Sequence, residues 1–137
     1  MGGAEEAVGY VDDLSIADSD EVLRRIPPWH QPRPGDEFRP NSSAFYDDPD
    51  GSPMSAYLAK DMAEAGLEFT VVMEDHPGFA LVAIRVELLR SLSQIIVRDP
   101  TDKEPFHALV VGPKTQGTRR RIAKSCRWVV EPESGRA

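Results

Sequence analysis

Residues 79–98 read FALVAIRVELLRSLSQIIVR, and this apolar stretch decides the fold class. The run at 79–86 is rich in β-branched residues and is typical of a strand. Residues 87–92 suit a short helical turn, and residues 94–98 suit a second strand. Strands separated by short helices, rather than by long crossover helices, favour an α+β fold over a parallel α/β fold.

The segments on either side extend this pattern. Ser52 as an N-cap, Pro53 in the first turn and Gly66 as a C-cap predict a helix over 52–66. The Pro77-Gly78 turn predicts a hairpin between strands 67–73 and 79–86. The remaining predicted elements are a strand or helical turn at 22–26, strands at 94–98, 106–111 and 127–130, and helices at 87–92 and 115–125. This order predicts a single small α+β domain, with a mixed or antiparallel sheet of about five strands and two main helices packed on one face.

Composition narrows the class of protein. The 137 residues, 40% of them hydrophobic, suit one domain. The 23 acidic and 16 basic residues give a net charge of -7, which argues against a protein that coats nucleic acid with its whole surface. The chain shows neither an apolar run of membrane-spanning length nor a signal-peptide pattern at its acidic start, so we expect a cytoplasmic protein with no membrane partner. Cys126 is the only cysteine, which excludes an internal disulfide.

Charge is distributed unevenly along the chain. Residues 1–21 are rich in acids and glycines and poor in large apolar groups, so we predict a flexible acidic N-terminal tail. The folded domain is predicted over 22–131, and a second flexible tail over 132–137. Residues 114–128 contain six basic residues and no acidic one. Such a block is either a solvated helix face or an anion site, and it is the only place where we expect nucleic acid to bind.

A long proline-rich loop over 29–50 is the first candidate site. Loops of this length in a compact domain are usually functional or disordered, and the aromatic residues favour an ordered one. Arg39 suits bidentate binding of a phosphate or carboxylate, with Ser42 or Ser43 donating a hydrogen bond and His30 acting as an acid or base. The alternative is a stiff crossover whose serines cap turns and whose aromatic side chains fill the core.

The second candidate site is the step from the 106–111 strand into the basic helix. Gly112 and Gly117 have the glycine spacing of a Walker A loop, but Thr118 and Arg119 replace its lysine and hydroxyl residue, which argues against a nucleoside triphosphate loop. A weaker phosphate site remains open beside plain turn chemistry. Its ligand residues would be Lys114, Thr118, Arg119, Arg120 and Arg121.

The histidines and the cysteine suggest no further chemistry. His30, His76 and His107 are too far apart in sequence for a local zinc motif, so we expect no metal and no cofactor. His107 stands at a strand entry, where a structural role is commoner than a catalytic one. Cys126 shares a helix face with Ile122, which predicts an inert thiol in the core.

Four segments carry a resemblance to small bacterial proteins that are described only as hypothetical. These segments are 23–27 (LRRIP), 39–45 (RPNSSAF), Asp99-Pro100 and 107–112 (HALVVG), and the resemblance spans roughly 22–131. It implies no activity that can be carried over to particular residues.

The chain is also loosely similar to ADP-ribosyltransferase-like and RES-type folds. The similar features are Arg24 on an early strand, the Ser-Ser-x-x-Tyr segment at 42–46, and Tyr57-Leu58-Ala59 followed by Ala63. This similarity implies a nucleotide-using enzyme with Arg24, Ser43, Tyr46 and His107 around a cleft. Those families need a further catalytic acid or histidine, for which only Glu104 and His107 are candidates.

We therefore predict a non-catalytic binding or interaction module. Its proline-rich aromatic loop and basic helix would contact a protein or a phosphate-bearing partner. One alternative is the ADP-ribosyltransferase-like or other nucleotide-using enzyme. The other is an acidic accessory or immunity protein that docks on a basic partner.

Overall fold

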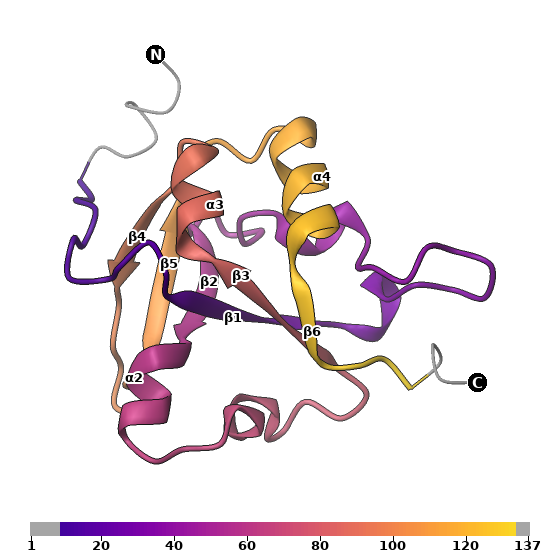
Figure 1. Cartoon of the computed structure of the whole chain (residues 1–137), viewed down its shortest axis with the longest axis horizontal. Helices are drawn as coiled ribbons and strands as arrows, with labels where there is room; N and C mark the ends of the chain where they lie inside the picture. The colour runs from indigo at the N-terminus through magenta and orange to yellow at the C-terminus, as the bar shows by residue number, and fades with distance from the viewer. Residues whose placement is uncertain (1–8, 134–137) are drawn as a thin grey trace.

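Six strands form one antiparallel sheet, in the order β4-β5-β2-β1-β3-β6, in a computed structural model that describes residues 9–133 (Figure 1). The strands are β1 (Glu21–Ile26), β2 (Met54–Leu58), β3 (Ala80–Arg85), β4 (Ile95–Arg98), β5 (His107–Val111) and β6 (Arg127–Val130). The helices are α2 (Ala59–Glu64), α3 (Val86–Ser91) and α4 (Gln116–Ser125), with 3-10 turns η1 (Pro28–His30), η2 (Ser42–Phe45) and η3 (Phe69–Met73). Every neighbouring pair of strands is antiparallel, so the predicted α+β class is confirmed, with six strands where about five are predicted.

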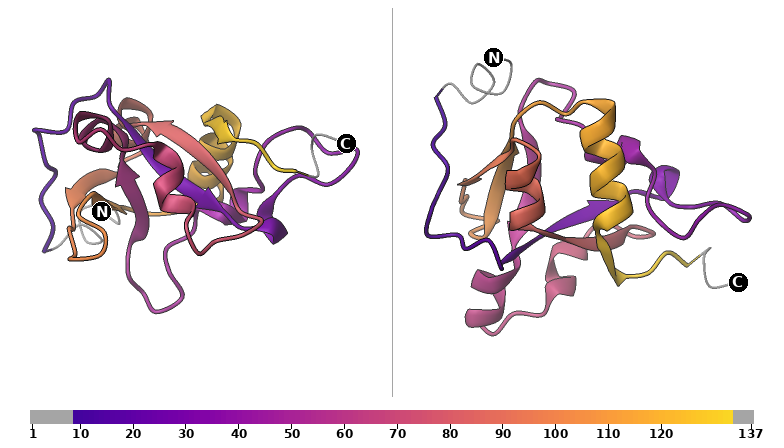
Figure 2. Two further views of the ribbon diagram at one scale, coloured as in Figure 1. Left: turned by 90° about the horizontal axis from the view of Figure 1, so that it is seen from below. Right: turned by 45° about the horizontal axis from the view of Figure 1, so that its top comes forward.

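The two faces of the sheet have different covers. Val22 and Ile26 of β1 pack with residues of α3, α4 and η2 on one face, which we call the α4 face. Leu23, one position along, packs with residues of α2 and η3 on the other, which we call the α2 face. Figure 2 shows α3 and α4 on the same side of the sheet. The two main predicted helices, at 52–66 and 115–125, do not share one face, because α2 covers the face opposite to α4. None of the helices in the described part of the chain is long and apolar enough to cross a membrane.

The predicted helix over 52–66 is wrong in its first half. Residues 54–58 form the strand β2, and only Ala59–Glu64 are helical. Met54, Ala56 and Leu58 point to the α4 face, while Tyr57 belongs to the cluster on the α2 face. Both faces of β2 are therefore buried between β1 and β5, and tertiary pairing overrides the local capping signals.

The predicted strand over 67–73, and with it the predicted hairpin, is also wrong. This segment forms η3 and irregular backbone, and it covers the α2 face instead of joining the sheet. Both edges of β3 are already occupied, because β1 pairs on one side and β6 on the other. The apolar run buries Val72 against the sheet and leaves Val71 exposed.

Residues 12–20, which the sequence assigns to an acidic tail, lie against the domain. The side chain of Asp12 accepts a hydrogen bond from the backbone N–H of Ile96 at 2.9 Å and pairs with Arg90 at 3.0 Å. Asp13 pairs with Arg98 at 2.9 Å. Ile16 is 2% exposed and belongs to the core cluster of the α4 face. Of the other predicted tail residues, 1–8 and 134–137 lie outside the described part of the chain.

This packing predicts that Ile16→Ala lowers the free energy of unfolding by about 2–5 kcal/mol, because it leaves a cavity in the core. Leu14→Ala is the matched control, since Leu14 is 83% exposed and its truncation should change stability by less than about 0.5 kcal/mol. Urea denaturation followed by circular dichroism measures both. Equal, small effects would show that the segment contributes no core packing.

Candidate functional site

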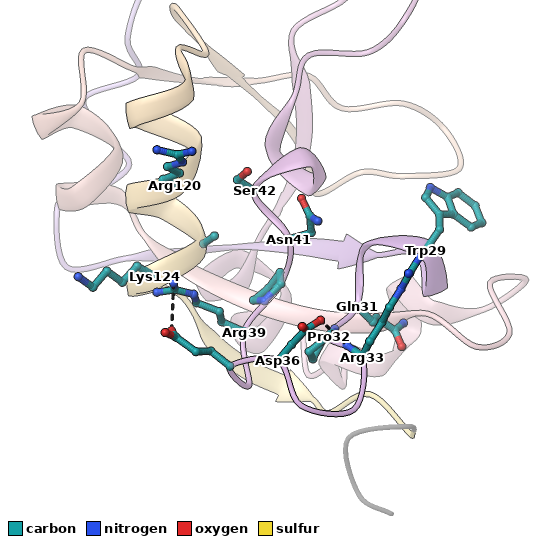
Figure 3. Close-up of a pocket in the computed structure, with 13 residues that line it drawn as sticks. Trp29, Gln31, Pro32, Arg33, Asp36, Arg39, Asn41, Ser42, Arg120 and Lys124 are labelled. Atoms are coloured by element: carbon teal, nitrogen blue, oxygen red, sulfur yellow. Dashed lines mark hydrogen bonds and ion pairs between the residues drawn. The ribbon is translucent and has the colours of Figure 1, made fainter.

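A cavity of about 670 Å³ lies between the proline-rich loop and helix α4, and we call it the groove (Figure 3). The loop contributes one wall and α4 the other, so the two predicted candidate sites meet here. The groove is lined by Trp29, Gln31, Pro32, Arg33, Asp36, Glu37, Arg39, Pro40, Asn41, Ser42, Arg120, Ala123 and Lys124.

The loop is closed and anchored by a few hydrogen bonds. The backbone N–H of Asn41 donates to the carbonyl of His30 at 2.8 Å and closes the part of the loop between these two residues. The side chain of Gln31 donates to the carbonyls of Ile26 and Gly78, at 3.0 and 2.9 Å. The indole of Trp128, on β6, donates to the carbonyl of Phe38 at 3.1 Å, and the two rings lie 5.5 Å apart. The wall of the groove is thus fixed to the end of β1 and to β6.

The turn η2 joins the loop to the sheet through a partly buried arginine. Arg24, on β1, donates from Nε and Nη2 to the carbonyl of Ala44 at 3.1 and 3.0 Å. Its Nη1 donates to the carbonyl of Ser55 on β2 at 2.8 Å. Burial lowers the pKa of Arg24, because the guanidinium loses water in exchange for neutral carbonyls. Asn41 caps η2 by accepting from the backbone N–H of Ser43.

Four cationic side chains from two separate elements line the groove. Arg120 and Lys124 are four residues apart on α4 and share one face of the helix. Neither forms an ion pair with a carboxylate of the described residues. Arg39 pairs with Glu37 at 3.0 Å, but both side chains are exposed, so this pair is worth little and an anion can replace it. Arg33, Asp36 and Glu37 complete the charged lining.

His30 adds no charge to this region near neutral pH. Burial and the nearby charge of Arg24 lower the pKa of its imidazole below 6.5, and its Nδ1 is buried without a hydrogen-bond partner among the described residues. The ring does not line the groove and lies edge-on to the Trp29 ring, at a centroid distance of 6.2 Å. The cationic character of the groove therefore comes from arginine and lysine and does not depend on histidine protonation.

The structure brings only some of the predicted ligand residues together. Arg39, Ser42 and Arg120 line the groove, whereas Ser43, Thr118 and Arg121 do not. Sequence reasoning missed Arg33, Asn41 and Lys124. The spacing of four between Arg120 and Lys124 was a usable signal for the last of these.

Two further predicted ligand residues serve the fold instead. Lys114 is almost fully buried, and its Nζ donates to the carbonyls of Val110 and Gly112 and pairs with Asp47 at 3.0 Å. Arg119 donates from Nε to the carbonyl of Lys114, and its guanidinium lies 3.8 Å from the ring centroid of Tyr46. These contacts attach the start of α4 to the sheet and to the residue that follows η2.

The space beside Gly112, in the loop before α4, is occupied by other residues of the chain. Gly112 has φ of +151°, and a Cβ at this position would lie 2.6 Å from the carbonyl oxygen of Ser93. The first turn of α4 is capped internally, since the hydroxyl of Thr115 accepts from the backbone N–H of Thr118 at 3.1 Å. Gly112 thus allows the backbone to pack closely against Ser93 and Gln94. Because the start of α4 is capped by Thr115, this loop gives no evidence for a phosphate site.

The residues of the enzyme alternative do not surround one cleft. Arg24, Ser43 and Tyr46 gather around η2 on the α4 face, and the donors of Arg24 are occupied by carbonyls. His107 pairs in register with Tyr57 and lies on the opposite, α2 face. Its Nδ1 is 3.0 Å from Oδ2 of Asp99 and 3.2 Å from the Asp99 carbonyl. Within the described residues, no three histidine, cysteine or acidic side chains gather in a way that could hold a metal ion.

Comparison with protein-family models, curated proteins and solved structures found no match to this chain. The two sequence resemblances stay predictions. The groove and its charges are therefore the basis for a functional proposal.

The two glycines before and within α4 predict opposite effects of the same substitution. Gly112→Ala should lower the free energy of unfolding by about 1–3 kcal/mol, because the new methyl group meets the Ser93 backbone and the Gln94 side chain. Gly117→Ala should raise it by up to about 1 kcal/mol, because alanine favours the helix and no atom lies closer than 4.0 Å to its Cβ. Thermal and urea denaturation measure both. Stability unchanged by Gly112→Ala would contradict the close packing at this loop.

Proposed function

We propose that this protein is a non-catalytic binding module whose groove holds a phosphate-bearing ligand. The observation that carries the proposal is the meeting of Arg33 and Arg39 from the loop with Arg120 and Lys124 from α4 around one cavity of about 670 Å³. Four cations outnumber the two carboxylates of the lining, although the whole chain has a net charge of -7. A positive groove on an acidic protein attracts anions locally and repels them elsewhere.

The chemistry of the lining favours phosphate over a simple carboxylate ligand. A phosphate group offers several oxygens and up to two charges, which suits guanidinium groups that approach from two walls. The Asn41 amide and the Ser42 hydroxyl lie between these walls and supply neutral hydrogen-bond donors (Figure 3). Trp29, 69% exposed at one end of the groove, offers an aromatic surface for an apolar part of the ligand.

The rigid walls support binding without catalysis. The loop is anchored at His30, Asn41 and Phe38, and α4 packs on η2, so the backbone segments that carry the cations are fixed before a ligand arrives. The groove lining contains no histidine or cysteine. Its two carboxylates are Asp36 and Glu37, and Glu37 is paired with Arg39. We place the protein in the cytoplasm, where phosphate-bearing metabolites, nucleic acids and modified proteins are available as partners.

The alternative of an acidic accessory protein loses part of its basis in the structure. Four acidic residues of the N-terminal region pair within the chain, with Arg90, Arg98 and Arg127. Their charge is therefore partly neutralised inside the protein, which weakens the attraction for a basic partner.

Binding of tripolyphosphate, measured by isothermal titration calorimetry, tests the proposal. We expect the affinity of the full chain to fall steeply between about 20 mM and 200 mM NaCl, because several cations contact the probe. Arg120→Glu should weaken binding at least about tenfold at low salt, which corresponds to about 1.4 kcal/mol.

Arg121→Glu is the matched control, because it makes the same charge change at the adjacent helix position but lies outside the groove. It should weaken binding less than about threefold, through long-range charge alone. Equal losses in the two variants would assign binding to net charge and not to the groove. No heat of binding at low salt would overturn the proposal.

A further inference from the structure

A second cavity, of about 370 Å³, lies on the α2 face, away from the groove. Its walls come from α2, from the 67–76 segment and from the loop before β5, and its floor is formed by β1 and β2. A cavity of this size fits one small molecule. It is lined by Arg25, Tyr57, Met62, Leu67, Val71, Val72, Glu74, Asp75, His76, Lys103, Glu104, Pro105 and Phe106.

The floor of this cavity is a fixed polar network. The hydroxyl of Tyr57, a residue only 5% exposed, donates to Oε2 of Glu104 in a short hydrogen bond. Burial and the Glu104 carboxylate raise the pKa of Tyr57 to about 12, so the phenol keeps its proton and holds Glu104 in place. The ring of His107 packs edge-on against Tyr57 at a centroid distance of 5.6 Å. Glu104 is thus positioned by Tyr57 on β2, which in turn packs against His107 on β5.

The cation Arg25 lines the same cavity as the Glu104 carboxylate without forming an ion pair with it. The guanidinium of Arg25 lies 5.1 Å from the centroid of the Tyr57 ring, and its Nη1 donates to the carbonyl of Val72 at 2.8 Å. No ion pair joins Arg25 to a described carboxylate. Guanidinium carries five N–H donors and Arg25 lines the cavity, so the hydrogen bond to Val72 leaves donors available to a ligand there. Arg25 and Glu104 therefore present opposite charges, held apart, in one cavity.

The covered parts of the remaining walls are largely apolar, and the other charged residues of the lining, Glu74, Asp75 and Lys103, are exposed to solvent. Met62 is buried, while Leu67 and Val71 are partly exposed at the cavity, a position in which large apolar side chains gain from being covered. His76 adds no charge at neutral pH, because burial, more than the nearby charge of Arg25, lowers the pKa of its imidazole. A ligand that satisfies this cavity needs a negative group, a positive group and an apolar body within a small volume.

We propose that this cavity binds a free α-amino acid with an apolar side chain. The carboxylate of the ligand pairs with Arg25, its ammonium group pairs with Glu104, and its side chain packs on Met62, Leu67 and Val71. A simple anion would face Glu104, and a simple amine would face Arg25, so only a zwitterion meets both groups. This binding site is separate from the groove and does not depend on the proposed function.

Titration with L-leucine, followed by the NMR signal of the Met62 methyl group and by calorimetry, tests this inference on the full chain. L-leucinamide, which lacks the carboxylate, and N-acetyl-L-leucine, which lacks the ammonium group, should each bind at least about tenfold more weakly. These two probes also represent the N-terminal and the C-terminal residue of a peptide. Equal binding of either probe and of leucine would overturn the proposal for a free amino acid.

Glu104→Gln should weaken leucine binding at least about tenfold, because it removes the charge but keeps an oxygen that accepts from Tyr57. Glu68→Gln is the matched control, since Glu68 is exposed in the same region but does not line the cavity, and it should leave binding unchanged. Arg120→Glu should also leave leucine binding unchanged, which separates this site from the groove. No binding of leucine, methionine or phenylalanine at millimolar concentration by the wild-type chain would overturn the inference.

Discussion

The guanidinium of Arg24 is the contact on which both the fold and the groove depend. It lies on the central strand β1 and donates to carbonyls of η2 and β2, so it joins the irregular loop to the middle of the sheet. Burying a cation among carbonyls costs desolvation energy, which the hydrogen bonds offset only while all of them are formed. Because α4 packs on η2, Arg24 also supports the position of the basic helix, together with the buried residues of α4.

Ion pairs within the chain divide the charges into two groups. Acidic residues near the N-terminus pair with Arg90 on α3, Arg98 on β4 and Arg127 on β6. The cations of α4 that face the groove have no such partner among the described residues. The excess of acidic residues in the chain therefore does not neutralise the cations that line the groove. This separation explains how a chain with a net charge of -7 presents a cationic surface.

Local sequence correctly predicts those helices and strands whose tertiary contacts favour the same secondary structure as their own residue pattern. The strands near residues 80–85, 95–98, 107–111 and 127–130 and the helix over Gln116–Ser125 are found close to their predicted positions. Residues 54–58 and 67–73 are different, since their state is decided by which edges of the sheet are open. The same limit applies to the site. Composition pointed to the loop and the basic helix, but only packing decides that Arg120 faces the groove while Arg119 stacks on Tyr46.

The hydrogen bond between Asn41 and His30 has a consequence for how this surface can diversify. Because the chain leaves and re-enters the domain at nearly the same point, the intervening residues, apart from the anchors Gln31 and Phe38, form a cassette whose length and sequence can change with little effect on the sheet. Arg33, Asp36, Glu37 and Arg39 all lie within this cassette, whereas Arg120 and Lys124 belong to the scaffold. One wall of the groove is thus free to drift and acquire new specificities, while the other supplies a constant attraction for negative charge.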